Sequence, residues 1–144
     1  MIIEDSIIIK ASIEKVWNTF IDITCWDRWN SVINNVKCNE KCLINGRNMR
    51  CTFRPFHFPI NVDIFINEVK EKEKIVWTAN KKGLKAYHEF LFTKNDGGIK
   101  VISKEEFSGV LSAGSGLFLP VRKMKELTRK FLNDLKKAVE GGLK

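Results

Sequence analysis

The pattern of apolar and polar positions divides the chain into a β-rich part and a helical last third. Between residues 32 and 110 apolar side chains recur at every second position, and from Leu117 onward they recur every three or four positions. The first spacing is typical of strands with one buried face, and the second of an amphipathic helix. Ahead of the β-rich part, the pattern predicts a strand over 2–11 and short helices over 13–21 and 22–29, the first with Ser12 as N-cap.

Turn signals separate six strands within the β-rich part. Asn45-Gly46 predicts a two-residue type I′ hairpin turn, which needs positive φ at both central positions and here would join strands near 32–43 and 47–54. The following RPFHFP (54–59) is predicted to be a loop, because its two prolines cannot belong to a central strand. The later strands are expected at 60–69, 75–80, 86–92 and 99–110.

The expected hairpin turn also fixes which side chains share a face. With the turn at 45–46, residue 42 faces 49, residue 40 faces 51 and residue 38 faces 53. The inner face would then carry Val36, Cys38, Glu40, Cys42, Met49, Cys51 and Phe53. Glu40 is the one charged member, and it would either face the interior or lie past the edge of the sheet in solvent.

These elements predict an α+β fold in the order β-α-α-β6-α. An antiparallel meander with one apolar face must bury that face, and the long apolar stripe near the C-terminus is the only partner the pattern offers. Pro120 is tolerated in the first turn of that helix and Gly141-Gly142 ends it. We therefore expect one domain over 1–144, a helix-grip in which a curved seven-stranded sheet wraps around the last helix.

Composition and charge narrow the function classes only slightly. The 144 residues include 44% hydrophobic side chains and carry a net charge of +8. No stretch approaches the ~20 apolar residues of a membrane span, and the first residues lack the basic region of a signal peptide, so we expect a cytoplasmic protein with reduced cysteines. The net charge indicates either attraction to nucleic acid, anionic lipid or acidic ligands or a compositional bias, and we favour the bias. The basic residues are scattered along the chain, with one concentration at 122–137.

Metal and nucleophile chemistry find little support. Cys38 and Cys42 would lie ~13 Å apart along a strand, too far to share a zinc ion with bonds of ~2.3 Å, and Cys51 would lie diagonal to both. A G-x-S-x-G nucleophile elbow does not occur in the sequence. We expect no metal and no cofactor, and interpret the cysteines as packing or cavity-lining thiols.

Strand register produces the sharpest cluster of polar residues. If the turns centre on Lys82-Gly83 and Asp96-Gly97, residue 77 faces 88 and residue 88 faces 105. Trp77, His88 and Glu105 would then form one row on the apolar side of three strands. A carboxylate beside an imidazole could hold a ligand hydroxyl or carbonyl, act as acid and base, or be a structural pair.

The motifs resemble those of the START-like (SRPBCC) helix-grip superfamily, which includes polyketide cyclase/dehydrase-type and birch-pollen-allergen-like proteins. The resemblance rests on ASIEKVWNTFIDITCWDRWNSVI (11–33), IVW (75–77), YHEFLF (87–92) and EEFSGVL (105–111). It implies a cavity between sheet and helix for a lipid-, polyketide- or sterol-like ligand, with Trp26 and Trp29 closing one end. It also places the 54–59 loop at the entrance as a lid or membrane contact, or packed on the helix end.

Together these arguments name a set of candidate ligand-contacting residues: Trp29, Cys38, Cys51, Phe53, Phe56, His57, Ile64, Trp77, His88, Phe90, Glu105, Phe107, Leu117, Val121, Met124 and Thr128. Three functions remain open. The first is binding of a hydrophobic small molecule, the second a cyclase or dehydratase using His88 and Glu105, and the third a basic module for membrane or nucleic acid. We expect a monomer or homodimer with a small-molecule partner, no nucleic acid and at most transient membrane contact.

Overall fold

Seven strands form a single antiparallel sheet in the order β1-β7-β6-β5-β4-β3-β2. The structure is a computed structural model, and it describes residues 1–54, 59–81, 84–108 and 120–142. The elements along the chain are β1 Ile2–Ile9, α1 Ile13–Ile21, the 3₁₀ helix η1 Ile23–Cys25, α2 Trp26–Trp29, β2 Ile33–Lys37, β3 Asn48–Phe53, β4 Ile60–Lys70, β5 Lys74–Lys81, β6 Leu84–Asn95, β7 Gly98–Ser108 and α3 Val121–Gly141. The expected α+β helix-grip is confirmed.

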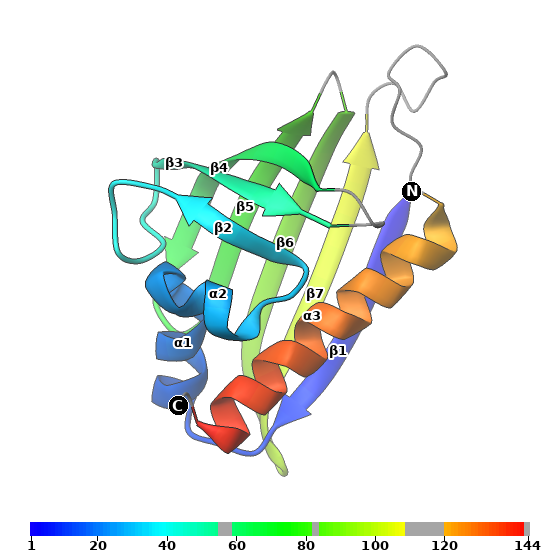
Figure 1. Cartoon of the computed structure of the whole chain (residues 1–144). Coiled ribbons are helices and arrows are strands. Elements are labelled where there is room, and N and C mark those ends of the chain that lie inside the picture. Colours follow the sequence, from blue (N-terminus) through cyan, green and yellow to red (C-terminus); the bar gives the residue numbers. More distant parts are fainter. Residues whose placement is uncertain (55–58, 82–83, 109–119, 143–144) are drawn as a thin grey trace.

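The long helix α3 lies across the concave face of the sheet, along β1 (Figure 1). Its buried stripe consists of Met124, Leu127, Thr128, Phe131, Leu132, Leu135, Ala138 and Val139. Pro120 stands at its N-cap, and Gly142, with φ of 74°, ends it. The period-3.6 stripe in the sequence therefore predicted the helix and its buried face from Met124 onward, whereas Val121, which the stripe also included, is 45% exposed.

Polar side chains of α3 also bind the backbone of β1. Arg129 Nη2 donates to Ser6 O at 3.1 Å, and Lys136 Nζ donates to Ile8 O at 2.7 Å. The backbone N–H of Lys10 donates to Glu140 Oε2 at 2.9 Å. These contacts hold the helix beside the first strand over most of its length.

The helices α1 and α2 fill one end of the grip with aromatic rings. Ser12 caps α1 by accepting from Lys15 N at 3.2 Å, as its place before the helix predicted. Phe20, at 0% exposure, lies with its ring centroid 4.8 to 6.2 Å from those of five other aromatic residues. Those five are Trp26, Trp77, Phe90, Phe92 and Phe131.

The registers expected for the last three strands are confirmed. Trp77 pairs with His88, and His88 pairs with Glu105. Further along the same hairpin, Phe92 pairs with Val101 and Lys94 with Ile99. The short connections between these strands therefore set the pairing that the sequence predicted. Trp77, His88 and Glu105 form one row across β5, β6 and β7.

The hairpin expected around Asn45-Gly46 is wrong. β2 ends at Lys37, and Ile33, not residue 38, pairs with Phe53. Gly46 has φ of 83°, but Asn45 does not have a positive φ, so a type I′ turn cannot form. Instead Arg47 N donates to Ile44 O at 3.2 Å, and Gly46 N donates to Ile66 O of β4 at 2.8 Å. The turn belongs to a loop that docks on β4.

Because β2 ends at Lys37 and β3 begins at Asn48, Cys38, Glu40 and Cys42 lie outside the strands. Cys38 is half-buried and its Sγ donates to Asn48 O at 3.6 Å. Cys42 forms an isolated bridge with Asp22. Glu40 lies beyond the sheet edge, 3.5 Å from Arg47 Nε, with its side chain 30% exposed. Of the two positions open to Glu40, the solvent side is therefore the one that the fold adopts.

Candidate functional site

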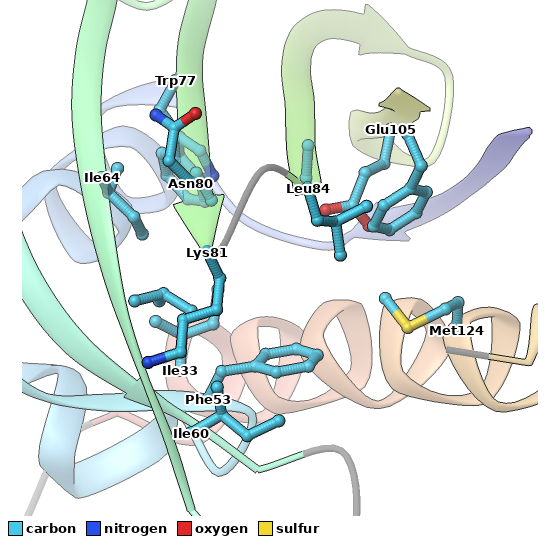
Figure 2. A pocket seen from close by; sticks show the side chains of 14 residues that line it. Ile33, Phe53, Ile60, Ile64, Trp77, Asn80, Lys81, Leu84, Glu105 and Met124 are labelled. Carbon is cyan, nitrogen blue, oxygen red and sulfur yellow. The ribbon is translucent and has the colours of Figure 1, made fainter. Parts of the chain in front are cut away.

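An apolar cavity of about 70 Å³ lies between the sheet and the N-terminal half of α3 (Figure 2). Its walls are Ile33, Phe53, Ile60, Val62, Ile64, Trp77, Ala79, Asn80, Lys81, Leu84, Ala86, Glu105, Phe107 and Met124. These residues come from strands β2 to β7 and from α3, so six of the seven strands contribute to one space.

The cavity exists because small side chains face each other across two strands. Ala79 of β5 pairs with Ala86 of β6, and both line the cavity. Their neighbours in the same inward rows are the large side chains of Trp77 and Phe107. Two methyl groups thus stand where the surrounding packing has bulky groups, and the unfilled volume remains between sheet and helix.

Three polar side chains interrupt the apolar wall. Asn80 and Lys81 lie where β5 ends, and Glu105 stands on β7 among apolar neighbours. Figure 2 shows the carboxyl oxygens of Glu105 turned toward the open space that Leu84 and Met124 border. The Glu105 side chain is 14% exposed. A carboxylate therefore faces an otherwise apolar cavity wall.

A buried imidazole contacts this carboxylate, and a buried hydroxyl contacts the far side of the imidazole. His88 Nδ1 lies 3.4 Å from Glu105 Oε2, and His88 Nε2 lies 2.7 Å from Ser103 Oγ. The imidazole stacks on the Phe90 ring at a centroid distance of 4.0 Å and meets the Trp77 ring edge-on at 5.5 Å. His88 and Ser103 are 7% and 1% exposed. Packing on both sides thus fixes the imidazole between a hydroxyl and a carboxylate.

The order Ser103, His88, Glu105 repeats the connectivity of a hydrolase triad but not its accessibility. Among the described residues, Ser103 is 1% exposed and does not line the cavity, so its Oγ is covered on the side that a substrate carbonyl would approach. The strand around it pairs on both sides, with Asp5 opposite Ser103 on β1 and Phe90 opposite it on β6. Those ladders use the backbone N–H groups that an oxyanion hole would need. The trio is therefore not built for nucleophilic attack by serine.

The candidate residues named from sequence fall into four groups. Those that line the cavity are Phe53, Ile64, Trp77, Glu105, Phe107 and Met124. Those that are buried elsewhere in the core are Trp29, Cys51, His88, Phe90 and Thr128. Cys38 and Val121 lie away from the cavity, Val121 with 45% exposure at the start of α3. Phe56, His57 and Leu117, and with them the expected lid in 54–59, lie outside the described residues.

Sequence reasoning did not name the remaining cavity residues. Those that line the space without having been named as ligand-contacting candidates are Ile33, Ile60, Val62, Ala79, Asn80, Lys81, Leu84 and Ala86. The signal for two of them was available, because the register that pairs residue 77 with 88 also pairs Ala79 with Ala86. A pair of alanines inside an apolar row marks unfilled volume.

Burial controls the acid–base chemistry of Cys51, which lies on β3. Cys51 is 1% exposed, and desolvation, with a smaller contribution from the charge of Asp63, raises the pKa of its thiol to about 12. The thiol is therefore neutral at physiological pH and packs as a small apolar group. No group of three or more His, Cys, Asp or Glu within the described ranges is arranged to hold a metal ion.

A second, larger depression of about 430 Å³ lies over β3, β4 and β5 and is lined by polar residues. Its main charges, Arg50 and Asp63, form an ion pair with Nε and Oδ1 2.9 Å apart, each about two thirds exposed. The Arg50 hydrogen bond lowers the pKa of Asp63. Because these groups neutralise each other in open solvent, the smaller apolar cavity is the better candidate site.

Comparison with protein families identifies the fold family. The model described as polyketide cyclase / dehydrase and lipid transport matches residues 1–140. The chain belongs to this family. This confirms the START-like, helix-grip resemblance that the VW and CWDRWN motifs indicated.

Solved structures agree with the polyketide cyclase / dehydrase assignment at the level of the fold. The hypothetical protein jhp0584 from Helicobacter pylori is 19% identical, with a TM-score of 0.79 over 96% of this chain and 88% of that one. Ara h 8.0201 is 14% identical with a TM-score of 0.71 over 99% of both chains. DynU16, from the dynemicin biosynthetic locus, is 14% identical with a TM-score of 0.73, and this chain covers 48% of its length.

A search of the curated proteins found no match for this chain. Among the helices in the described part of the chain, none is long and apolar enough to cross a membrane. Two cations of the basic segment of α3 make contacts with β1, since Arg129 pairs with Asp5 and Lys136 Nζ donates to the backbone carbonyl of Ile8. These cations therefore hold the helix on the sheet.

Proposed function

We propose that this protein binds an apolar or amphipathic small molecule in the cavity between the sheet and α3. The observation that carries the proposal is a cavity with apolar walls and one inward carboxylate, at the place where two small residues leave volume unfilled. Ligand sites are typically concave and mostly apolar, with a few polar groups that orient the ligand. The description of the family, which joins polyketide chemistry and lipid transport, supports the same class of ligand.

The size of the cavity limits what its described walls can hold. Its volume of about 70 Å³ is below the ~300–1,000 Å³ of typical ligand pockets. The walls described here suit one apolar segment, such as the end of an alkyl chain or one ring edge. A larger ligand would extend past Asn80 and Lys81 or displace the N-terminal turns of α3.

A series of straight-chain alcohols tests the proposal. Hexanol, octanol and decanol should each raise the thermal unfolding midpoint of the purified protein, because ligand at about 100 times its Kd adds roughly 2.7 kcal/mol to the stability of the folded state. The shift should grow with chain length until the cavity is filled. If no alcohol shifts the midpoint or gives a titration signal, the binding proposal fails.

One observation favours a second candidate function, acid–base catalysis on a polyketide-like substrate. Glu105 and His88 put a carboxylate and an imidazole side by side, with the carboxylate at the cavity wall. Proton transfer of this kind underlies cyclisation and dehydration of carbonyl compounds. Turnover of a model polyketide by the wild type, with loss of turnover in Glu105→Gln and retention in Glu106→Gln, would support catalysis. Binding without turnover would leave only the carrier function.

A further inference from the structure

His88 lies between the Ser103 hydroxyl and the Glu105 carboxylate that lines the cavity. His88 has two ring nitrogens with different neighbours, Ser103 Oγ at 2.7 Å from Nε2 and Glu105 Oε2 at 3.4 Å from Nδ1. The proton positions on such a ring follow from what each neighbour can donate or accept. The arrangement therefore favours particular tautomers.

Only one neutral tautomer satisfies all three groups. With the proton on Nδ1, the N–H points to the Glu105 carboxylate, and Nε2 can accept the Ser103 hydroxyl proton. With the proton on Nε2, the Nδ1 lone pair would face the carboxylate, and the buried Ser103 hydroxyl would have lost its acceptor. A buried donor without an acceptor is costly, so the Nδ1–H form is selected.

The Glu105 carboxylate retains acceptor capacity that the described residues do not use. A carboxylate offers about four lone-pair positions, and His88 is the partner found for Glu105 among the described polar groups. The remaining oxygen positions face the apolar space beside Leu84 and Met124 (Figure 2). A group that fills them must donate a hydrogen bond or carry positive charge.

We propose that Ser103 fixes the Nδ1–H tautomer of His88, and that the Glu105 carboxylate, so oriented, selects ligands ending in a hydroxyl or ammonium group over those ending in a carboxylate. This inference rests on the proposed function, because it assigns the polar end of the same ligand. Glu105 contacts the ligand directly, whereas His88 and Ser103 are positioning residues. A carboxylate ligand would bring two like charges together in a low-dielectric cavity.

The binding test compares three probes of equal chain length, octanol, octylamine and octanoate, by calorimetric titration at pH 7. The wild type should bind octylamine and octanol at least tenfold more tightly than octanoate. Glu105→Gln should lose most of this preference. Glu106→Gln, whose side chain is exposed on the next position of β7, should keep it as the matched control.

The outcomes separate this inference from the proposed function. If none of the probes binds the wild type, both the proposed site and the selection fail. If all three bind and Glu105→Gln leaves the preference unchanged, the site stands and the selection by Glu105 is overturned.

Nitrogen NMR of histidine tests the positioning role without any ligand. The chain has two histidines, so His88→Asn assigns the His88 signals by their loss. The wild type should show His88 protonated at Nδ1, Ser103→Ala should shift the ring toward a mixture, and Ser103→Thr, which keeps the hydroxyl, should restore Nδ1–H. A wild-type ring protonated at Nε2 would overturn the role of Ser103.

Discussion

The indole nitrogen of Trp26 donates to the backbone carbonyl of Phe20 at 2.8 Å. Trp29, three residues on, packs against Trp26 at a ring-centroid distance of 6.1 Å, but its own Nε1 is buried with no partner among the described residues. Two neighbouring indoles of the same motif thus differ in the cost of their N–H groups. The Trp26 N–H has exchanged water for a protein acceptor, whereas the Trp29 N–H has lost its water without gaining a partner among the described residues.

Replacing each of these tryptophans by phenylalanine should separate the two effects. Trp26→Phe leaves the Phe20 carbonyl without its indole donor, which costs roughly 1–3 kcal/mol beyond the lost packing. Trp29→Phe loses similar packing but removes an unsatisfied donor. Its loss in unfolding free energy should therefore be at least about 1 kcal/mol smaller than that of Trp26→Phe. Urea unfolding of both variants measures the difference. Equal losses would mean that the Trp29 N–H has a partner in solution.

The turn between β6 and β7 contains two glycines, and only Gly98 occupies a position that excludes a larger residue. Gly98 has φ of 140°, and a Cβ there would lie 2.2 Å from Ile9 O. At Gly97 the nearest atom would be Ile8 Cγ2, at 3.6 Å. Gly98→Ala should therefore lower the free energy of unfolding by at least about 2 kcal/mol, through strain and collision with backbone.

Gly97→Ala is the control for this substitution, because its Cβ meets only ordinary van der Waals distances. It should change stability by less than about 1 kcal/mol. Chemical unfolding of both variants decides the point. A Gly98→Ala variant as stable as wild type would show that the β1–β7 edge can move away from the turn.

Burial of Cys51 predicts a pH-dependent loss of stability in the alkaline range. The pKa of its thiol is raised from 9.0 to about 12 in the folded protein, because burial disfavours the thiolate. Above pH 9 the unfolded chain releases this proton and the folded chain does not, so stability falls by up to about 1.4 kcal/mol per pH unit until pH 12. Cys51→Ala should lack this component.

The measurement is the difference in unfolding free energy between wild type and Cys51→Ala as a function of pH. The cavity left by the substitution adds a constant offset, whereas the thiol ionisation adds a slope above pH 9. In the native state at pH 8, iodoacetamide should modify the half-buried Cys25, Cys38 and Cys42 before Cys51. Modification of Cys51 at a comparable rate would contradict its burial.

Filling the cavity should abolish ligand binding without unfolding the protein. Ala86→Leu adds three carbon atoms at a position where the facing residue is Ala79, so the cavity should lose most of its volume. Overpacking of this kind costs about 1–3 kcal/mol, which circular dichroism and the unfolding midpoint will register. Lys85→Leu, on the exposed face of the same strand, should keep the octanol-induced shift. Octanol binding by Ala86→Leu would place the ligand elsewhere.

Sequence reasoning succeeded where short turns dictate the pairing. The β6–β7 turn leaves little freedom, so the row from Trp77 through His88 to Glu105 followed from counting residues. It failed at Asn45-Gly46, where the same counting assumed a hairpin. There the loop binds Ile66 of β4, a contact distant in sequence that outweighs the local preference of the dipeptide.

The inner-face position of several cavity residues was predictable from the sequence, but the contacts between the polar side chains were not. Strand parity placed Phe53, Ile64 and Phe107 on the inner face, and all three line the cavity. Ser103 pairs with Phe90 on the neighbouring strand, but its hydroxyl bonds His88, two residues away on that strand, and this diagonal bond depends on the rotamers of both side chains. Side-chain rotamers follow from packing around the imidazole, which no local pattern in the sequence encodes.

The contacts between α3 and β1 have a consequence for how the protein behaves among its own copies. β1 is an edge strand, and Arg129 and Lys136 bind its backbone oxygens at Ser6 and Ile8. Glu140 accepts from the backbone N–H of Lys10, which directly follows the strand. Free edge groups of this kind are where a strand from another molecule would add. The opposite edge, β2, is five residues long and irregular at Asn35, with φ of 52°. The helix that closes the cavity thus also blocks strand addition at one margin of the sheet, while a kinked, short strand protects the other.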